Sequence, residues 1–330
     1  MLKNWKLWLS LLISGVALFL ALRDIQFDAF FAALSRANIV WLIPSFIIFL
    51  ASLGLRAIRW SKLMGDTPFW TTFHAMNIGY LLNMVLPFRV GEVGRAYVMG
   101  ERSTVSMTRA FSTIIVERVL DLASLVLIFA VFTQVIPLPQ AFSSAALVGG
   151  AVAVLVMAVL AIMVYQADRA ETVLTKILSR IPRIHPESWL RRFRDLCEGF
   201  SLVRNPRLLL TSLALTALIW VGMFGVAFFT MLAFYPASFL MSVSAVIASN
   251  LGGALPSAPG GLGVVQFFAQ QSLALPFGMD ISLATAFAFV WSLWQQLALI
   301  LLGLFGLTRI GMSFSQTAGA ARTEEGINKK

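Results

Sequence analysis

Residues 208–234 have the sequence LLLTSLALTALIWVGMFGVAFFTMLAF, a run of 27 residues without a charged side chain. An α-helix rises 1.5 Å per residue, so about 20 apolar residues cross the hydrocarbon core of a bilayer. The whole chain has this character: 59% of its 330 residues are hydrophobic and 12% are charged, about half the charged share of a soluble domain. The composition excludes a soluble globular protein and predicts an all-α polytopic membrane protein.

Five further apolar runs are long enough to cross a bilayer, and three more are shorter, polar or interrupted by Gly and Pro. The first run is preceded by Lys3 and Lys6, like a signal peptide, but no small-x-small cleavage site follows it. We therefore interpret it as a retained helix. The long runs are Trp5–Leu22, Ile39–Leu55, Met107–Gln134, Phe142–Tyr165 and Ile281–Leu307, and the weak ones are Phe69–Pro87, Ala237–Leu255 and Leu262–Phe277.

The placement of Lys and Arg indicates how the weak runs enter the membrane. Cytoplasmic loops collect Lys and Arg, and the loop 166–207 carries nine of them against five Asp and Glu. If residues 69–87 enter and leave on one face, the basic segments 56–62 and 89–109 share the cytoplasmic side with that loop. The same argument makes 237–277 a second hairpin from the outer face. We predict six full spans and two oppositely oriented re-entrant hairpins, in a bacterial- or archaeal-type cytoplasmic membrane with both termini inside.

The two predicted hairpins share a local pattern. Leu86–Gly94 (LPFRVGEVG) and Leu255–Gly263 (LPSAPGGLG) both fit L-P-x-x-x-G-x-x-G, and each follows an asparagine, Asn83 or Asn250. Each hairpin also follows two spans and precedes one. The repeat therefore predicts two halves related by inversion, an arrangement that many secondary transporters build from interrupted helices.

We divide the chain accordingly. A single transmembrane domain covers residues 1–310, with inverted halves 1–140 and 141–310. The segment 311–330 is small, polar and charged, so we expect a disordered cytoplasmic tail.

The loop 166–207 is predicted to form two short amphipathic helices around Pro182 and Pro186. The second has its apolar residues on one face and Arg191, Arg192 and Arg194 on the others, so it either lies on the anionic cytoplasmic leaflet or packs on the bundle. Its apolar residues are Trp189, Leu190, Phe193, Leu196 and Phe200.

Charged residues occur at membrane depth near the first hairpin tip. Glu117 and Asp121 share a helix face with Arg118 alongside, and each charge at the bilayer centre costs about 2.5–3.5 kcal/mol. In one interpretation the arginines bind an anionic headgroup bidentately, Asn83 helps to position them, and the acids either position them or carry protons. In the other, the charges form a buried ion-pair network. The candidate headgroup residues are Arg89, Arg95 and Arg118, and the positioning residues are Glu92, Glu117, Asp121 and Asn83.

The second hairpin tip has no charged residue. It offers backbone N–H groups and close approach, as Gly-rich turns do, and Gln266 is a candidate donor to a headgroup. Tight helix packing is the alternative interpretation of this tip. The candidate residues are Asn250, Pro256, Pro259, Gly260, Gly261, Gly263 and Gln266.

Three motifs in order along the chain resemble a known family. They are N-x-x-L-P-F-R-x-G-E-x-x-R over Asn83–Arg95, E-R-x-x-D over Glu117–Asp121 and P-x-x-P-G-G-L-G over Pro256–Gly263. Over about residues 5–310 the chain resembles the transmembrane domain of lysylphosphatidylglycerol synthases and stand-alone flippase-like proteins built from that domain. The resemblance implies a lipid-translocating domain with the charged residues of the first two motifs near the lipid path.

The chain differs from this pattern at two points. About twenty residues follow the last span, where the synthases carry a soluble aminoacyl-transfer domain, so we expect no enzymatic activity. Relatives often have an acidic residue after the Gly-rich turn, where this chain has Gln266, which argues against a proton-carrying role for the second hairpin.

The leading hypothesis is translocation of an anionic, phosphate-bearing lipid between leaflets. The alternative is a non-transporting scaffold that holds a lipid- or envelope-modifying enzyme, with the loop 166–207 as docking surface. An enzyme acting on headgroups is the weakest hypothesis, because no nucleophile–base pair or metal-ligand spacing is visible around Cys197, His74 or His185. We expect no metal, cofactor or nucleic acid, since the excess of ten positive charges follows from topology. The oligomeric state is left open.

Overall fold

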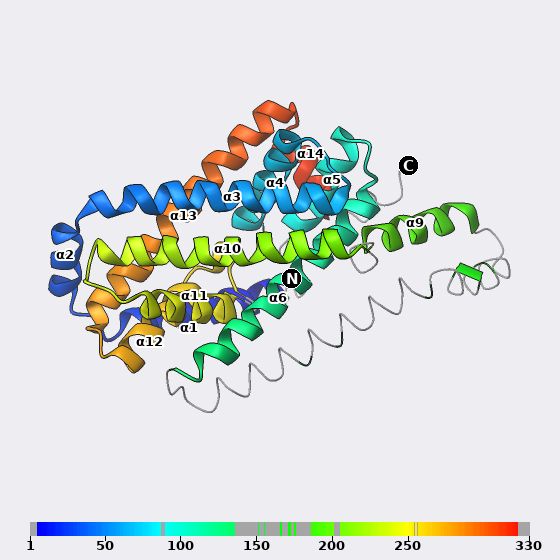
Figure 1. The fold of residues 1–330 in the computed structure, drawn as a ribbon. Coiled ribbons are helices and arrows are strands. Elements are labelled where there is room, and N and C mark those ends of the chain that lie inside the picture. The colour runs from blue at the N-terminus through cyan, green and yellow to red at the C-terminus, as the bar shows by residue number, and fades with distance from the viewer. Residues whose placement is uncertain are drawn as a thin grey trace.

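The computed structural model describes residues 5–86, 90–135, 186–200, 205–253 and 257–322, together with 151, 155, 166, 171, 172, 175 and 255. Every regular element in these ranges is a helix, which confirms an all-α fold (Figure 1). The elements are α1 Trp5–Leu22, α2 Phe27–Arg36, η2 Ile39–Trp41, α3 Leu42–Met64, α4 Phe69–Val85, α5 Gly91–Arg102, α6 Met107–Phe132, α9 Pro186–Gly199, α10 Pro206–Leu232, α11 Phe239–Gly253, η5 Pro259–Gly261, α12 Val264–Phe277, α13 Ile281–Ile310 and α14 Phe314–Arg322.

Three described helical stretches are long and apolar enough to cross a bilayer: Ile39–Met64, Pro206–Leu232 and Ile281–Ile310. A fourth forms if α1 and α2, which meet at 84°, count as one broken span. The predicted span Phe142–Tyr165 lies outside the described residues. The structure therefore confirms several membrane-length apolar helices, as an integral membrane protein requires.

Helix α3 is longer than the apolar run that predicted it. The run ends at Leu55, whereas the helix continues to Met64 and ends at Gly65, whose φ of 98° is the left-handed conformation of a helix C-cap. Arg56 and Arg59, interpreted from sequence as a flanking basic segment, are therefore inside the helix. Buried guanidinium groups need carboxylate partners, and these come from α6.

The longest helices pack side by side. α3 lies along α10, with Ser45 Oγ donating to the Val226 carbonyl at 2.9 Å. Ser52 meets Gly222, where an added Cβ would collide with Ser52 Oγ. α13 packs along α4 through Gly303, which lies against the Asn77 carbonyl and Leu81. Small residues allow these backbones to approach closely. This is usual in membranes, where the hydrophobic effect does not drive helices together and close packing takes its place.

Two pairs of shorter helices form hairpins. α4 packs on α5 across a break at residues 86–90, and α11 packs on α12 across a break at residues 254–263. The tips contact each other, because η5 packs on α4 and Gly260 lies against Met84. The two breaks fall at the L-P-x-x-x-G-x-x-G repeats, so the repeat predicted both of them.

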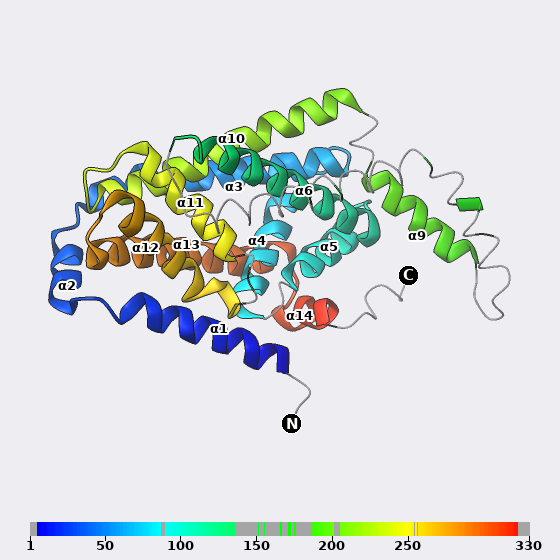
Figure 2. The ribbon, with the colours of Figure 1, turned by 90° about the horizontal axis from the view of Figure 1, so that it is seen from below.

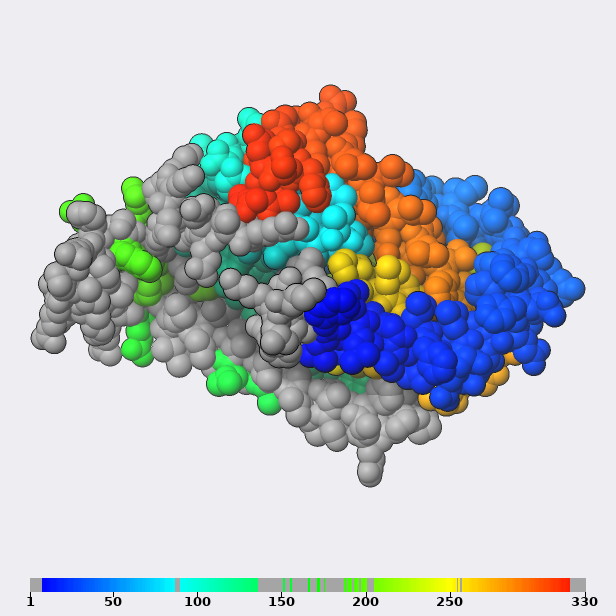
Figure 3. Space-filling view, turned by 180° about the vertical axis from the view of Figure 1, so that it is seen from behind, coloured from blue at the N-terminus to red at the C-terminus, as the bar shows by residue number. Residues whose placement is uncertain are grey.

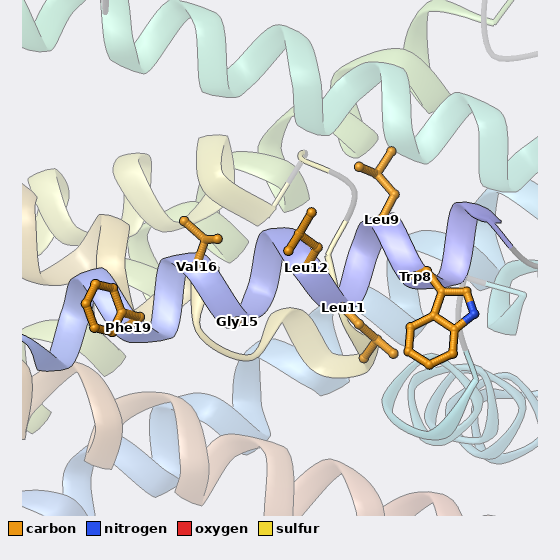
Figure 4. Close-up of a pocket in the computed structure, with 7 residues that line it drawn as sticks. All are labelled: Trp8, Leu9, Leu11, Leu12, Gly15, Val16 and Phe19. Carbon is orange, nitrogen blue, oxygen red and sulfur yellow. The ribbon is translucent and has the colours of Figure 1, made fainter.

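Helix α1 lies at the edge of the bundle and packs on α12 (Figures 2 and 3). Its outward side chains Trp8, Leu12 and Phe19 are each more than 60% exposed. They belong to a shallow apolar depression whose seven lining residues all come from α1 (Figure 4). An apolar face of this size fits the hydrocarbon region of a bilayer.

Helices α2 and α9 lie at opposite ends of the bundle in Figures 1 and 2. α9 is the second of the two predicted amphipathic helices, and its C-terminal end packs on α6. There Ser106 Oγ donates to Asp195 at 2.6 Å and Arg109 pairs with Glu198 at 3.1 Å. Trp189 near its other end is 48% exposed. Packing on the bundle therefore holds the C-terminal end of α9.

The expectation of a disordered tail is wrong for residues 314–322. They form α14, which packs on α5. Thr317 is fully buried and Ala318 nearly so, because small side chains let the short helix lie close to α5. Arg102 at the end of α5 also donates to the Gly311 carbonyl at 3.0 Å. These contacts bury part of a segment whose polar composition had predicted disorder.

Candidate functional site

A closed ring of six charged side chains lies beside the first hairpin tip. Helix α3 contributes Arg59, α5 contributes two residues one turn apart, and α6 contributes three. Carboxylates and guanidinium groups alternate around the ring. The nitrogen–oxygen distances are Arg59–Glu117 3.2 Å, Glu117–Arg95 2.9 Å, Arg95–Glu92 2.7 Å, Glu92–Arg118 2.6 Å, Arg118–Asp121 3.8 Å and Asp121–Arg59 2.7 Å.

The ring has a buried side and an open side. The side chains of Arg59, Arg95 and Glu117 are at most 4% exposed, whereas that of Arg118 is 43% exposed. Glu92 and Asp121 lie between these extremes at 19% each. The buried members hold α3, α5 and α6 together. The exposed member, Arg118, has a guanidinium group that a ligand can reach from outside the ring.

A further arginine stands next to the open side. Arg56 Nη1 is 3.8 Å from Asp121 Oδ2, the oxygen that Arg118 also approaches at 3.8 Å. Neither contact is a hydrogen bond at that length, so both guanidinium groups are only weakly engaged there. The six ring charges cancel, three against three, and Arg56 leaves the site with a net charge of +1. The open side is electropositive.

Neutral side chains support the buried arginines. The Arg95 guanidinium lies over the Trp60 ring at 4.6 Å, a cation–π contact. The indole N–H of Trp60 donates to Thr113 Oγ1 at 3.0 Å. Arg59 Nη1 also donates to Thr216 Oγ1 of α10 at 2.7 Å. Arg59 and Arg95 are therefore held from several sides and are not free to bind a further anion.

The first hairpin tip sets the position of Glu92 and Arg95. Asn83 Oδ1 accepts a hydrogen bond from the Gly91 N–H at 2.8 Å, which caps the start of α5. Gly79 and Gly91 bring the backbones of α4 and α5 into contact, since a Cβ on Gly91 would collide with the Gly79 carbonyl oxygen. Asn83 thus acts on the ring through the backbone, as a positioning residue.

The second tip is closed by uncharged hydrogen bonds. Gln266 Oε1 accepts from the Gly263 N–H at 2.8 Å, and its Nε2 donates to Ser292 at 2.7 Å. The Ala258 N–H donates to Ser14 Oγ of α1 at 2.7 Å. Gln266 is 1% exposed, so its amide is occupied within the protein. This arrangement favours tight packing over headgroup contact at Gln266.

The remaining predicted residues of the second tip have backbone roles. Gly260, Gly261 and Gly263 have φ between 70° and 83°, conformations that favour glycine. Pro259 starts η5, and Asn250 Nδ2 donates to the Val246 carbonyl at 2.8 Å, within its own helix. Arg89 and Pro256 lie outside the described residues.

The structure brings together five charged residues predicted from sequence, namely Glu92, Arg95, Glu117, Arg118 and Asp121. Sequence reasoning missed Arg56 and Arg59, whose side chains reach acids more than fifty residues away. A signal was present in the sequence: no Gly or Pro separates the apolar run from these arginines before Gly65. Continued helix past Leu55 was therefore the simpler prediction.

The fold and the ring define a polytopic, all-helical integral membrane protein with a charged centre at the tip of a helical hairpin. Residues 7–303 match the family described as the lysylphosphatidylglycerol synthase TM region, and the chain belongs to this family. It is 28% identical over 254 residues to a UPF0104 membrane protein of Methanothermobacter thermautotrophicus, covering 71% of this chain and 75% of that protein. No solved structure matches the chain.

Proposed function

We propose that this protein moves a lipid with an anionic, phosphate-bearing head between the two leaflets, and that Arg118 and Arg56 contact the head. The observation that carries the proposal is the open side of an otherwise buried ion-pair ring, where Arg118 is 43% exposed and where both Arg118 and Arg56 are 3.8 Å from Asp121. Guanidinium groups match phosphate oxygens in bidentate geometry. Membership of a membrane family named after a lipid synthase region supports a lipid as the ligand.

The ring can release Arg118 without leaving a carboxylate unpaired. Glu92 keeps Arg95 at 2.7 Å, and Asp121 keeps Arg59 at 2.7 Å. An uncompensated buried charge would be strongly destabilising, so this redundancy lowers the cost of exchanging a carboxylate for a phosphate. Arg95, predicted as a headgroup ligand, lies between two acids and Trp60, and we reassign it to positioning.

The membrane arrangement that we propose follows the charge distribution. The two hairpins enter from opposite faces of a cytoplasmic membrane, with six full spans and both termini inside. Contact between Gly260 and Met84 supports a meeting of the tips within the protein. Broken backbone at membrane depth needs such a protein environment, because lipid cannot satisfy its free N–H and C=O groups.

We propose transport without covalent chemistry. The three carboxylates of the site are each held by at least two arginines, an arrangement suited to binding and to fixing geometry. A general base would instead need a carboxylate within reach of a substrate proton.

Reconstitution in liposomes tests the proposal. Purified protein should accelerate exposure of a fluorescent phosphatidylglycerol to an impermeant quencher, and Arg118→Ala should abolish the acceleration. Arg118→Lys should retain part of it, since the charge remains without the bidentate geometry. Arg23→Ala is the matched control, because Arg23 is exposed and pairs only with its neighbour Asp24 in the described part of the chain. Wild-type rates equal to those of empty liposomes across a panel of anionic lipids would refute transport.

A scaffold for a lipid- or envelope-modifying enzyme is the second candidate. It is favoured by α9, whose Trp189 is 48% exposed and whose Arg194 side chain is 60% exposed. Aromatic and arginine side chains are enriched at protein interfaces. The liposome experiment separates the two functions, since a scaffold without its partner accelerates nothing.

A further inference from the structure

Two tryptophans on α13, Trp291 and Trp294, have buried indole N–H groups without an acceptor in the described part of the chain. Trp291 is 7% exposed and stacks on Phe287 at 5.6 Å. Trp294 meets Phe49 of α3 edge to face at 5.1 Å. The rings are thus fixed by aromatic packing, while both polar atoms remain unsatisfied.

Unsatisfied donors at this depth require an explanation. Burying a hydrogen-bonding group without a partner is costly, because the group loses its hydrogen bonds to water. An indole nitrogen is a donor only, so Trp291 and Trp294, three residues apart on one helix face, cannot satisfy each other. His74 Nδ1 and Asn77 Oδ1 of α4 are also unsatisfied, but they can form a complementary donor and acceptor pair across a bridging water. The described residues therefore give neither indole N–H an acceptor, so both donors are available to a group that the protein binds.

The tryptophans lie close to the charged site along α3. Phe49, which Trp294 touches, is seven residues before Arg56 and therefore on the same helix face, about 10 Å away at 1.5 Å per residue. The tips lie at the same level, because Gln296 of α13 donates to the Gly260 carbonyl at 3.3 Å and Gly260 lies against Met84. A lipid head leaving the arginines toward the outer end of α3 meets these donors next.

We propose that Trp291 and Trp294 form a second, uncharged site that binds an acceptor oxygen of the phospholipid, either a phosphate-ester or an acyl-ester oxygen. The inference rests on the proposed function and adds a second step to the path. Passage through a membrane requires binding strong enough to enter and weak enough to leave. Two neutral donors hold an oxygen less tightly than two guanidinium groups, so the site provides an exit from the charged ring.

Indole resonances provide a direct test. The full chain labelled with ¹⁵N-tryptophan is purified in detergent without lipid, and the two signals are assigned with Trp291→Phe and Trp294→Phe. Dihexanoyl phosphatidylglycerol should shift both indole N–H protons downfield in a saturable way. Trp8, which is 67% exposed on α1, is the reference signal. The proposal would be overturned if both indole protons already had the chemical shift of a hydrogen-bonded N–H without lipid and did not shift when lipid was added. That result would mean that water fills the site.

A second titration separates lipid from free anion. Inorganic phosphate alone should leave both signals unmoved, because the contacts described for Trp291 and Trp294 are aromatic and include no cationic side chain to hold a dianion. A shift with phosphate alone would overturn the assignment to a lipid.

Failure of this inference is distinguishable from failure of transport. A saturable shift in a protein that does not accelerate lipid exposure would leave the tryptophan site standing without the proposed function. Acceleration without any shift would refute the tryptophan site alone. If both hold, Trp294→Phe should slow translocation about tenfold, the effect of one lost hydrogen bond, while the ring contact with Phe49 is kept. Trp8→Phe should leave the rate unchanged.

Discussion

Arg95 and Arg118 belong to one ion-pair ring, yet their surroundings give them different roles. Arg95 is buried, contacts Glu92 and Glu117 at 2.7 and 2.9 Å, and lies over Trp60. Arg118 has one close partner, Glu92, and a long contact to Asp121. Removing a buried, doubly paired charge harms folding, whereas an exposed ion pair contributes little to stability. The two kinds of residue are therefore separable by mutation.

Glu117→Gln should destabilise the protein. Glu117 is buried between Arg59 and Arg95, and the substitution leaves two buried guanidinium groups with one carboxylate fewer. Breaking such a buried pair costs roughly 3–5 kcal/mol. The expected result is a clearly lower melting temperature, measured by fluorescence-detected size exclusion after heating in detergent.

Arg118→Ala is the control for this measurement. Its melting temperature should be close to that of the wild type, because the Arg118 side chain is 43% exposed. Glu92 would remain paired with Arg95, and Asp121 with Arg59. A large loss of stability in Arg118→Ala, or none in Glu117→Gln, would contradict the division into a buried and an open side.

Among the helical elements, the two hairpins have similar breaks but contact the neighbouring helices in different ways. The first is fixed to α6 by ion pairs of Glu92 and Arg95, and to α3 by the cation–π contact of Arg95 with Trp60. The second is fixed to α1 and α13 by neutral hydrogen bonds, through Ala258 and Gln266. Charged contacts respond to a competing anion and neutral ones much less so. Under the proposed function, the first hairpin is accordingly the element on which we expect a bound headgroup to act.

Gly91→Ala should weaken the first hairpin. A Cβ at this position collides with the Gly79 carbonyl oxygen and approaches Asn83 Oδ1 at 2.6 Å. Backbone atoms cannot move aside cheaply, and such overpacking costs roughly 1–3 kcal/mol. The expected result is a lower melting temperature together with slower lipid exposure, because Glu92 shifts with the start of α5.

Gly54→Ala is the matched control for glycine replacement. Gly54 lies inside α3 with nothing within 4 Å of the added Cβ. Alanine favours the helix by roughly 0.5–1 kcal/mol over glycine, so stability should be unchanged or slightly higher. Equal effects at the two positions would exclude backbone contact between α4 and α5 as the cause.

For the whole molecule, the open question is on which side of the membrane the ends of each hairpin lie. A re-entrant first hairpin puts the residues before α4 and after α5 on one side, and a crossing helix puts them on opposite sides. The family match over residues 7–303 establishes the class of protein, and labelling decides between these two arrangements.

Cysteine labelling tests the arrangement on a Cys197→Ser background. Asp66→Cys and Glu101→Cys should react with an impermeant maleimide only from the cytoplasmic side. Arg23→Cys, which follows α1, should react only from the outer side. Labelling of positions 66 and 101 from different sides would overturn the re-entrant hairpin and the inverted repeat.

Particular residues show how far the sequence could predict the site. Glu117, Arg118 and Asp121 were predictable, because helical spacing places them side by side within one apolar run. Glu92 and Arg95 followed from the break after Pro87. Arg56 and Arg59 were not assigned, because a basic stretch after an apolar run is typical of a helix end at the membrane surface.

Sequence alone was enough to establish that the protein is helical, lies in a membrane and breaks its helices at two repeated motifs. These properties are local: hydrophobicity, length and the backbone preferences of Gly and Pro act within one segment. Three features became visible only in the packed molecule: Arg59 closes the ring, Arg95 is buried and Arg118 is exposed. Those outcomes depend on how α3, α5 and α6 pack, and contacts between distant segments leave no periodic trace in the chain.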